Sequence, residues 1–467
     1  MATNPSYQKR PKRPEHARHR PWLRAGCAVL LVCCVAAPVS GQTTDESRLT
    51  VVQAVERALA AYPSIRTAEA RGVEALAAVR EAETAGRPTL DLWSQATQHQ
   101  KPTVVSPIHG FTLDTAPPFE HLLFQTWLSG TYTLFDGGRQ DASVAHARSA
   151  VDEVATETAA ARQEVMARVV ATYARVLSRH QVLLAHESRL TALGAERTRV
   201  EQRLEVGRAA RLEILRTSAA VAGAEADRVR FAEALDTAER ELARLIGTDP
   251  GATRARQLVA FDLSQPPGDR AQFLEVALAR NPGVASARQR VATADTAIVL
   301  ADTTRQPRVS LTGRLTDFGS AVGHFTNEWS TGVQLAYPLL DGGAARTRVA
   351  RAQAGRDVAR ARLRLATTDV GTSLDRTLSA AREADARATS LGAAIAQFEE
   401  ITRIEQLRLD EGVGTLTDYL LAEAELLGAR AGLVEARYAT LAARVELARV
   451  TGQLELPWLR QYLRTAS

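Results

Sequence analysis

The chain reads YTLFDGGR at residues 132–139 and YPLLDGGA at residues 337–344, two related stretches that lie 205 residues apart. Each is followed by a long region without proline, and proline inside a helix costs about 3 kcal/mol. Glycine pairs permit unusual backbone dihedrals, and an aspartate can cap the free N–H groups of a first helical turn. The sequence therefore predicts a structural switch from strand to helix at Asp136-Gly137-Gly138 and at Asp341-Gly342-Gly343. A phosphate-binding loop is not expected, because its glycines would need a following Lys-Ser/Thr pair.

The same offset continues through both halves of the chain and indicates an internal duplication. Gly138 and Gly207 are 69 residues apart, as are Gly343 and Gly412. Nearer the N-terminus, ALAAYP (58–63) corresponds to ALARNP (277–282), but at an offset of 219. The first copy therefore carries 14 extra residues, which we place in a surface loop because loops tolerate insertions.

Each copy is expected to hold one very long helical hairpin. Proline is absent from residues 139–249 and 339–456. Apolar residues recur every seven positions in the first copy, as they do along coiled-coil helices; they are Val169, Val176, Leu183 and Leu190. A helix from Arg139 to Glu205 would be about 100 Å long. Gly207 and Gly412 then mark the turns, and shorter helical segments are expected over 52–86 and 271–305.

Between these helices the apolar pattern changes to a period of two, which is typical of strands. Four strands are predicted, over about 88–98, 122–135, 307–318 and 328–340. Their length of about 11–14 residues suits a tilted strand that crosses a bilayer, although a soluble sheet with one buried face gives the same pattern. Aromatic residues near the strand ends suit an interfacial girdle; they are Phe124, Tyr132, Trp329 and Tyr337.

Four strands are too few to close a barrel, and an open sheet edge in lipid leaves backbone groups without partners. Strands that enter a membrane would therefore have to be shared among several copies of the chain. We expect membrane insertion to require oligomerisation.

The N-terminus has the features of a secretory signal peptide, which we place at residues 1–41. Residues 1–24 carry a net charge of +6, and the apolar run within AGCAVLLVCCVAAPVSGQ (25–42) follows. An uncleaved anchor is the alternative. The formal charge of the whole chain is +5, so the remainder is near neutral, which argues against nucleic acid as a partner. The three cysteines, Cys27, Cys33 and Cys34, all lie in this segment, so no disulfide or thiolate site is expected beyond it.

No catalytic motif of the HExxH, GxSxG or CxxC type occurs in the chain. The histidines are scattered, and the many helical carboxylates next to arginines are typical of solvated coiled-coil faces. We therefore expect no enzyme activity, no metal site and no cofactor.

With these features the chain resembles the TolC-like family of bacterial outer-membrane efflux proteins. The resemblance covers about residues 48–455 and rests on the duplication, the Asp-Gly-Gly entries and two hairpin tips, RLEVGRAARLEIL (203–215) and RLDEGVGTLTDYLLAEAEL (408–426). It implies a mainly helical fold with membrane strands, in which three chains form a twelve-stranded outer-membrane β-barrel continuous with a periplasmic α-barrel. The implied domains are a first repeat (48–250, hairpin 139–246), a linker (251–269), a second repeat (270–455, hairpin 344–452) and a C-terminal tail (456–467). We expect linker and tail to be surface segments without chemistry.

The resemblance also implies a gate at the hairpin tips. Asp418 falls on the first aspartate of the family's pore constriction, whereas the second falls on Leu421. The positions of the family's latch arginine, latch tyrosine and acidic partner fall on Gly414, Leu409 and Glu213. The acidic constriction is thus only partly carried over. Asp418 could equally be an early-helix acid that caps together with Thr415. The tip turns that a partner would approach contain Gly207, Glu213, Gly412 and Gly414.

The function that this resemblance implies is a passive exit duct of a tripartite efflux or type I secretion system in a Gram-negative bacterium. Its implied partners are two further copies of the chain, a periplasmic adaptor (membrane fusion protein), an inner-membrane pump of the RND, ABC or MFS type, and outer-membrane lipid. A soluble periplasmic coiled-coil adaptor or scaffold is the alternative. The sequence identifies neither the cargo nor the pump.

Overall fold

The computed structural model describes residues 48–105, 118–251, 257–263, 268–323 and 325–465. All of them belong to one compact unit, Glu46–Ser467. The expected signal peptide lies outside the described residues. So do residues 106–117, which hold most of the loop between the first two expected strands.

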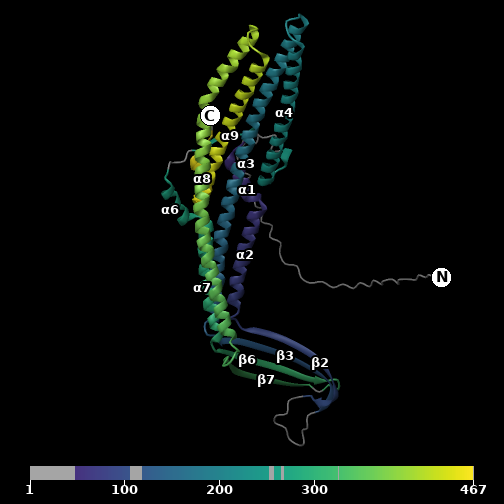
Figure 1. Ribbon diagram of the computed structural model, residues 1–467. Helices are drawn as coiled ribbons and strands as arrows, with labels where there is room; N and C mark the ends of the chain where they lie inside the picture. The colour runs from purple at the N-terminus through teal and green to yellow at the C-terminus, as the bar shows by residue number, and fades with distance from the viewer. Residues whose placement is uncertain (1–47, 106–117, 252–256, 264–267, 324, 466–467) are drawn as a thin grey trace, which may run out of the picture. The chain divides into compact units, whose positions relative to one another are not determined.

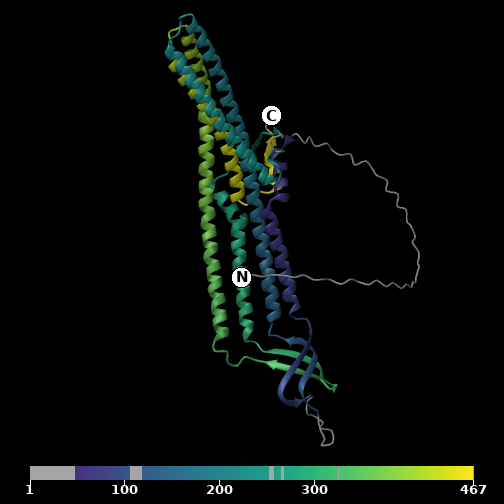
Figure 2. The ribbon, with the colours of Figure 1, turned by 90° about the vertical axis from the view of Figure 1, so that its right-hand side faces the viewer.

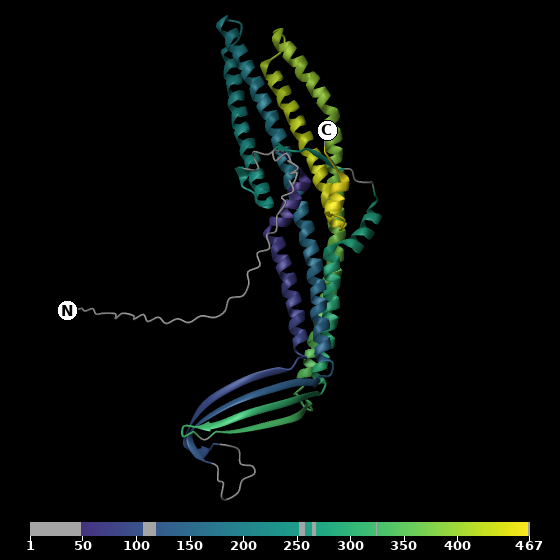
Figure 3. The same cartoon turned by 180° about the vertical axis from the view of Figure 1, so that it is seen from behind.

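Two helices of 67 residues each dominate the unit, α3 (Arg139–Glu205) and α8 (Ala344–Asp410). At 1.5 Å per residue each is about 100 Å long. α4 (Arg211–Ile246) returns along α3, and α9 (Leu416–Val450) returns along α8. Each turn contains a glycine in the left-handed region, Gly207 or Gly412, where a residue with a side chain would be strained. The two hairpins are visible in Figure 3, with their tips at the end away from the strands.

The shorter helices before the strands are each broken in two, which the sequence analysis did not anticipate. The first segment consists of α1 (Val51–Ala61) and α2 (Pro63–Thr84). The second consists of α6 (Arg270–Arg280) and α7 (Pro282–Asp302), followed by the 3₁₀ turn η1 (Thr303–Arg305). The breaks occur before proline because the preceding residue, Tyr62 or Asn281, adopts an extended conformation.

The helices form two rows of four that share α3 and α8. In the half next to the strands, α2 packs on α3, α3 on α7 and α7 on α8. In the distal half the order is α4, α3, α9, α8. Figure 2 shows the helices of the half next to the strands side by side in this order, and Figure 3 shows the two distal hairpins beside each other. Within the described residues, no helix combines the length and the hydropathy needed to cross a bilayer.

Four antiparallel strands form a sheet in the order β2-β3-β6-β7. They are β2 (Thr89–Val104), β3 (Phe119–Phe135), β6 (Arg308–Ser320) and β7 (Thr326–Ala336). The strand expected to continue to 340 ends at Ala336, before Pro338, which has no N–H to donate. The strands connect to the ends of α2 and α7 and to the starts of α3 and α8, so the sheet lies at that end of the helix row (Figure 1).

A core halfway along the helices contains both ends of the described chain. β1 (Arg48–Leu49) pairs with β4 (Gln257–Leu258), and β5 (Phe261–Leu263) pairs with β8 (Leu463–Thr465). The Tyr173 hydroxyl of α3 lies 2.6 Å from the carbonyl oxygen of Leu49 and 2.8 Å from that of Val259, and so ties the first pair to the helix.

The expectation that linker and tail are surface segments is wrong for their described parts. α10 (Leu456–Tyr462) places Leu459, which is 0% exposed, in this core. Phe261 and Leu263 of the expected linker are buried there too. Short strands and a two-turn helix have too few residues to display an apolar period, so the sequence pattern did not reveal their burial.

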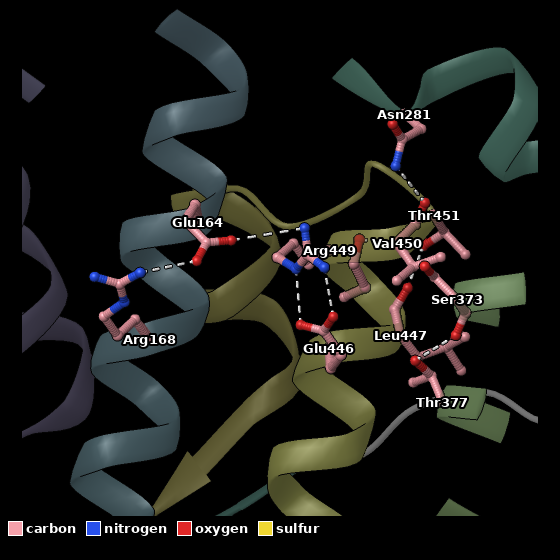
Figure 4. A network of polar contacts seen from close by, with 11 residues as sticks. Glu164, Arg168, Asn281, Ser373, Thr377, Glu446, Leu447, Arg449, Val450 and Thr451 are labelled. Carbon is pink, nitrogen blue, oxygen red and sulfur yellow. Dashed lines mark hydrogen bonds and ion pairs between the residues drawn. The ribbon is translucent and has the colours of Figure 1, made fainter. Parts of the chain in front are cut away.

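Polar contacts fix the end of α9 at the same level (Figure 4). Arg449 makes a bidentate pair with Glu446, at 2.7 and 2.5 Å, and reaches Glu164 of α3 at 3.7 Å. The side-chain amide of Asn281 donates to the Val450 carbonyl oxygen at 2.9 Å. The end of the second hairpin is therefore attached both to α3 and to the break between α6 and α7.

Candidate functional site

The two Asp-Gly-Gly segments form hydrogen-bonded starts of α3 and α8. Asp136 accepts hydrogen bonds from the backbone N–H groups of Gly138, Arg139 and Gln140 at 3.0, 3.1 and 2.8 Å. Asp341 accepts from Gly343 at 2.9 Å and from Ala345 at 2.6 Å. The bond from the Ala345 amide is the main reason why the pKa of Asp341 is held below its ordinary value. These carboxylates satisfy N–H groups that a helix start leaves without partners.

All four glycines of the two segments have positive φ, between 63° and 87°. Gly137 also lies against the segment before β6, since a Cβ added there would be 2.0 Å from the Gln306 Cβ. Conformation and space together therefore require glycine at 137.

The sheet has one apolar face and one polar face. Directly paired residues share a face, and the row Leu92, Leu128, Leu315, Trp329 crosses all four strands on the apolar face. The neighbouring apolar rows contain Leu90, Tyr132, Leu311, Val333 and Leu335, all solvent-exposed in the single chain. The opposite face carries mostly polar side chains, such as Gln95, Gln125 and Arg314. An exposed apolar area of this size requires something to cover it.

β2 and β7 are the edge strands of this sheet, and neither has a partner on its outer side within the described residues. The helix row next to the sheet ends correspondingly with α2 and α8. β2 and β7 run in opposite directions, because each of the three strand pairs between them is antiparallel. A second copy could therefore continue the antiparallel pattern at either edge.

At the second hairpin tip, Asp418 takes part in a helix cap. The Thr415 hydroxyl donates to its carboxylate at 2.7 Å, and the Asp418 N–H donates back to the Thr415 hydroxyl oxygen at 3.2 Å. Gly414 packs against the end of α8, where a Cβ would be 2.8 Å from the Arg408 Cβ. Leu421 is exposed and Leu409 is buried beside Leu416 and Tyr419.

Glu213 has the corresponding local role at the first tip, where it accepts from the Ala210 N–H at 3.3 Å. The hydrogen bonds of Asp418 and Glu213 in the structure are thus made within their own hairpins. Both residues are gate candidates from the sequence, and in a single chain these local hydrogen bonds hold their side chains in place.

Other residues, which the sequence analysis missed, connect the two hairpin tips. Arg199 of α3 pairs with Asp410 at the end of α8 at 3.0 Å. Arg216 of α4 donates to the Thr417 hydroxyl of α9 at 2.8 Å. Each link joins residues more than 200 positions apart. No local sequence pattern signals such a link, because it depends on the register between two separate hairpins.

Arg199 also pairs with Glu196 at 3.1 Å, and this glutamate is only 2% exposed. Burial is the main cause of its raised pKa, and the positive charge of Arg199 opposes the shift. One carboxylate oxygen of Glu196 is buried without a hydrogen-bond partner. The tip contact therefore contains a carboxylate whose charge is disfavoured by its surroundings. Over the described residues, no three metal-binding side chains gather in one place.

The family model described as "Outer membrane efflux protein" matches residues 54–248 and 273–453. The fusaric acid resistance protein FusA of Burkholderia cepacia is 27% identical over 48% of this chain and 44% of its own length, so the match spans less than half of that relative. The outer membrane efflux protein BepC of Brucella suis is 25% identical over 69% of this chain and 70% of its own.

Among solved structures, the outer membrane protein VceC of Vibrio cholerae is similar with a TM-score of 0.72. The alignment covers 86% of this chain and 96% of VceC, at 21% identity. At that identity the likeness concerns the fold alone.

Proposed function

The chain belongs to the outer membrane efflux protein family, and on that premise we propose that it is the outer-membrane exit duct of a tripartite efflux or type I secretion system. The family is one of channels rather than enzymes. In the proposed assembly three chains form a twelve-stranded barrel in the outer membrane of a Gram-negative bacterium. Their helices continue it as a tunnel through the periplasm, and substrates pass without catalysis or a cofactor.

The observation that carries the proposal is the open sheet with one apolar face. Backbone groups at a free edge find no water in lipid, so a membrane sheet has to close. Four strands per chain and antiparallel edges fit closure by β7 of one copy against β2 of the next. Three copies would supply twelve strands, and the apolar face would meet lipid. The rows with Trp329 and Tyr132 would lie near opposite borders of the apolar band, where aromatic girdles occur.

The helix row offers matching edges. α8 carries exposed apolar residues that follow helical spacing; they are Ala350, Ala354, Val358, Ala361 and Leu365, and Val358 also borders a pocket shared with α3 and α7. α2 has a shorter stripe of exposed apolar residues, Ala70, Val73 and Ala77, of which Val73 also borders a pocket between α2 and α3. Pairing of β7 with β2 of the next copy would bring these two faces together, because the strands lead directly into these helices.

Charge supports the same contact. Residues 344–364 contain seven arginines and one acid, and Arg356 is the only one of the seven that pairs with a carboxylate in the described part of the chain. α2 has a net charge of −1, with Glu74 and Glu81 on its exposed side. We therefore propose that α2 and α8 of adjacent copies form the helical seam between subunits.

The proposed partners are a periplasmic adaptor and an inner-membrane pump of the RND, ABC or MFS type. FusA is named for resistance to fusaric acid. By analogy, this chain would conduct compounds that its inner-membrane pump exports. We propose that the tip turns with Gly207, Glu213, Gly412 and Gly414 are where an adaptor approaches. The Asp-Gly-Gly segments have a structural role in this proposal, as the joints between barrel and tunnel.

Asp418 is proposed to line the periplasmic entrance. Three such carboxylates around a threefold axis would attract cations. Single-channel recording of Asp418→Ala should therefore show weaker block by multivalent cations than the unmodified channel. Glu411→Gln removes one charge from the same tip and controls for a general charge effect. Unchanged block in Asp418→Ala would remove Asp418 from the pore.

Fractionation of cells that express the full chain tests the main proposal. We expect the protein in the detergent-extracted outer-membrane fraction, as a trimer that resists SDS without heating. Release of a monomer by osmotic shock would instead favour the soluble periplasmic scaffold. Planar-bilayer recording of the purified trimer should then show discrete conductance steps.

A further inference from the structure

Two tryptophans interrupt the polar face of the sheet. Trp93 of β2 and Trp127 of β3 are directly paired across the strands, and their row continues with Thr316 and Glu328. The row on one side of them is Asp91, Ser129, Arg314 and Ser330, and the row on the other side is Gln95, Gln125, Phe318 and Thr326, in which Phe318 is the one apolar member. The pair is therefore a local aromatic patch on a hydrophilic surface.

The adjacent register position shows which face this is. Leu92, Leu128, Leu315 and Trp329 form the next row along the strands, and side chains of successive residues point to opposite faces. Trp329 therefore lies at nearly the same height as Trp93 and Trp127, but on the apolar face. In the proposed barrel Trp329 would meet lipid, whereas Trp93 and Trp127 would face the lumen.

The geometry of the pair leaves it accessible. The two ring systems are nearly parallel, at 12°, with their centroids 6.3 Å apart. The Arg314 guanidinium lies 5.9 Å from the Trp127 centroid, within the range of a cation–π contact. Trp93 is 58% exposed. Arg314 is also exposed, and no carboxylate of the described residues lies within 4.0 Å of its side-chain nitrogens. Two flat aromatic rings thus lie beside a guanidinium group that forms no ion pair with the described residues.

We propose that Trp93, Trp127 and Arg314 form a binding site for planar aromatic anions on the inner wall of the barrel. The inference rests on the proposed function, which supplies the lumen. An aromatic ring of the cargo stacks on the indoles, since stacked or offset arrangements are favourable for π systems. A carboxylate or similar anionic group on the cargo binds the Arg314 guanidinium. Three copies of the site would surround the path of the cargo.

A purely structural role is the competing explanation, because cross-strand aromatic pairs also stabilise sheets. The competing explanation does not predict that the lumen binds aromatic anions, nor that Arg314 affects such binding. Binding and location are therefore the measurements that separate the two.

The first experiment locates the rings in the full trimer in lipid vesicles. Variants that retain one strand tryptophan, with the other strand tryptophans and Trp458 changed to Phe, are exposed to aqueous iodide and to brominated lipid. We expect iodide to quench Trp93 and Trp127, and brominated lipid to quench Trp329. Quenching of Trp93 and Trp127 by brominated lipid would overturn the proposal.

The second experiment measures block of the single-channel current by 2-naphthoate, with its saturated counterpart decahydro-2-naphthoate as the matched probe. We expect the aromatic anion to bind about three- to tenfold more tightly, the range that one aromatic contact contributes. Trp127→Leu should remove most of this preference, whereas Arg314→Gln should weaken block by both anions. Trp329→Leu, at the same height on the other face, should retain the preference.

The outcomes of these experiments distinguish failure of the proposed binding site from failure of the proposed channel. If unmodified channels conduct but discriminate the two probes no better than Trp127→Leu channels do, the proposed binding site is wrong. The proposed function would then remain intact. A chain that forms no conducting trimer would remove both. Unchanged block by 2-naphthoate in Arg314→Gln would also contradict the site as proposed, because its anion contact would then be absent.

Discussion

Asp136 and Asp341 cap the two longest helices from a position before the N-cap. The N-cap residues themselves are Gly138 and Gly343, which have left-handed backbones and no side chain that could accept a hydrogen bond. An aspartate two residues earlier supplies the missing acceptor. The motif thus combines two requirements of a sharp turn, a flexible backbone and an anionic group at the positive end of the helix.

Replacing Asp136 by alanine should loosen the start of α3. Loss of an N-terminal cap costs about 1 kcal/mol, so amides of the first turn should exchange about fivefold faster with solvent. Hydrogen exchange with mass spectrometry of the peptide around residue 140 measures this. Asp141→Ala, which removes the same charge from the same turn, is the control because none of the cap hydrogen bonds goes to Asp141. Equal exchange in both variants would contradict the capping role.

Glu196 should make the tip contact sensitive to pH. Burial raises its pKa in the folded state, so the folded chain favours the protonated form. Stability from this group is complete below the ordinary glutamate pKa of about 4.3 and is lost as pH rises through the raised folded value. Glu196→Gln should therefore raise the thermal midpoint at pH 7 and reduce its dependence on pH above 4.

The control for this prediction is Glu201→Gln, which changes an exposed glutamate of the same helix that pairs with Arg197 at 3.6 Å. Thermal unfolding followed by circular dichroism between pH 4 and 8 supplies the comparison. A midpoint of Glu196→Gln that falls with pH as steeply as that of the unmodified chain would show that this carboxyl does not control the tip.

At the level of helices and strands, local chemistry predicted the elements much better than their partners. The helices of 67 residues follow from the absence of proline and from glycines at both ends. The breaks at Pro63 and Pro282 follow from the same rule, applied to segments that the sequence analysis had treated as continuous. Which element lies beside which depends on side chains far apart in the chain, and no local pattern predicts such neighbours. The burial of α10 is the clearest example.

The proposed seam between α2 and α8 can be tested by disulfide formation between subunits. Val73 lies 11 residues before the end of α2, and Ala354 lies 10 residues after the start of α8, so each is about 15 Å from the end of its helix that is nearer the sheet, at 1.5 Å per residue. The cysteines of the chain all lie within residues 1–41. In the Val73→Cys, Ala354→Cys double variant, oxidation should therefore produce a ladder up to a cross-linked trimer on SDS gels.

Pairing Val73→Cys with Val229→Cys provides the control, because Val229 is similarly exposed but belongs to α4 in the distal half. Cross-linking of equal extent in both double variants, or none in either, would contradict the seam. On the same gels, run after heating and without reductant, single variants should migrate as monomers.

In the whole molecule, the sheet and the row of helices next to it end at matching edges, β2 with α2 and β7 with α8. Contact between subunits at these edges would therefore close the sheet and the helix row together. The sequence already indicated that four strands are insufficient and that several copies are required. It did not reveal the links between the hairpin tips, because the family positions expected to form a latch are occupied by Gly414 and Leu409. In the structure, Arg199 and Arg216 connect the tips through Asp410 and Thr417 instead.

If these links hold the proposed periplasmic entrance closed, removing them should open it. Exposed pairs contribute about 0.5 kcal/mol each, so six links in a trimer would amount to about 3 kcal/mol, a shift of about a hundredfold between closed and open states. Arg199→Ala combined with Arg216→Ala should therefore increase single-channel conductance in planar bilayers. Arg197→Ala combined with Arg208→Ala removes the same charge from the same tip, and Arg197 pairs within α3 rather than across the hairpins. Conductance that rises equally in both double variants would indicate a charge effect, whereas a rise confined to the first would identify the two inter-hairpin links as the closing contacts.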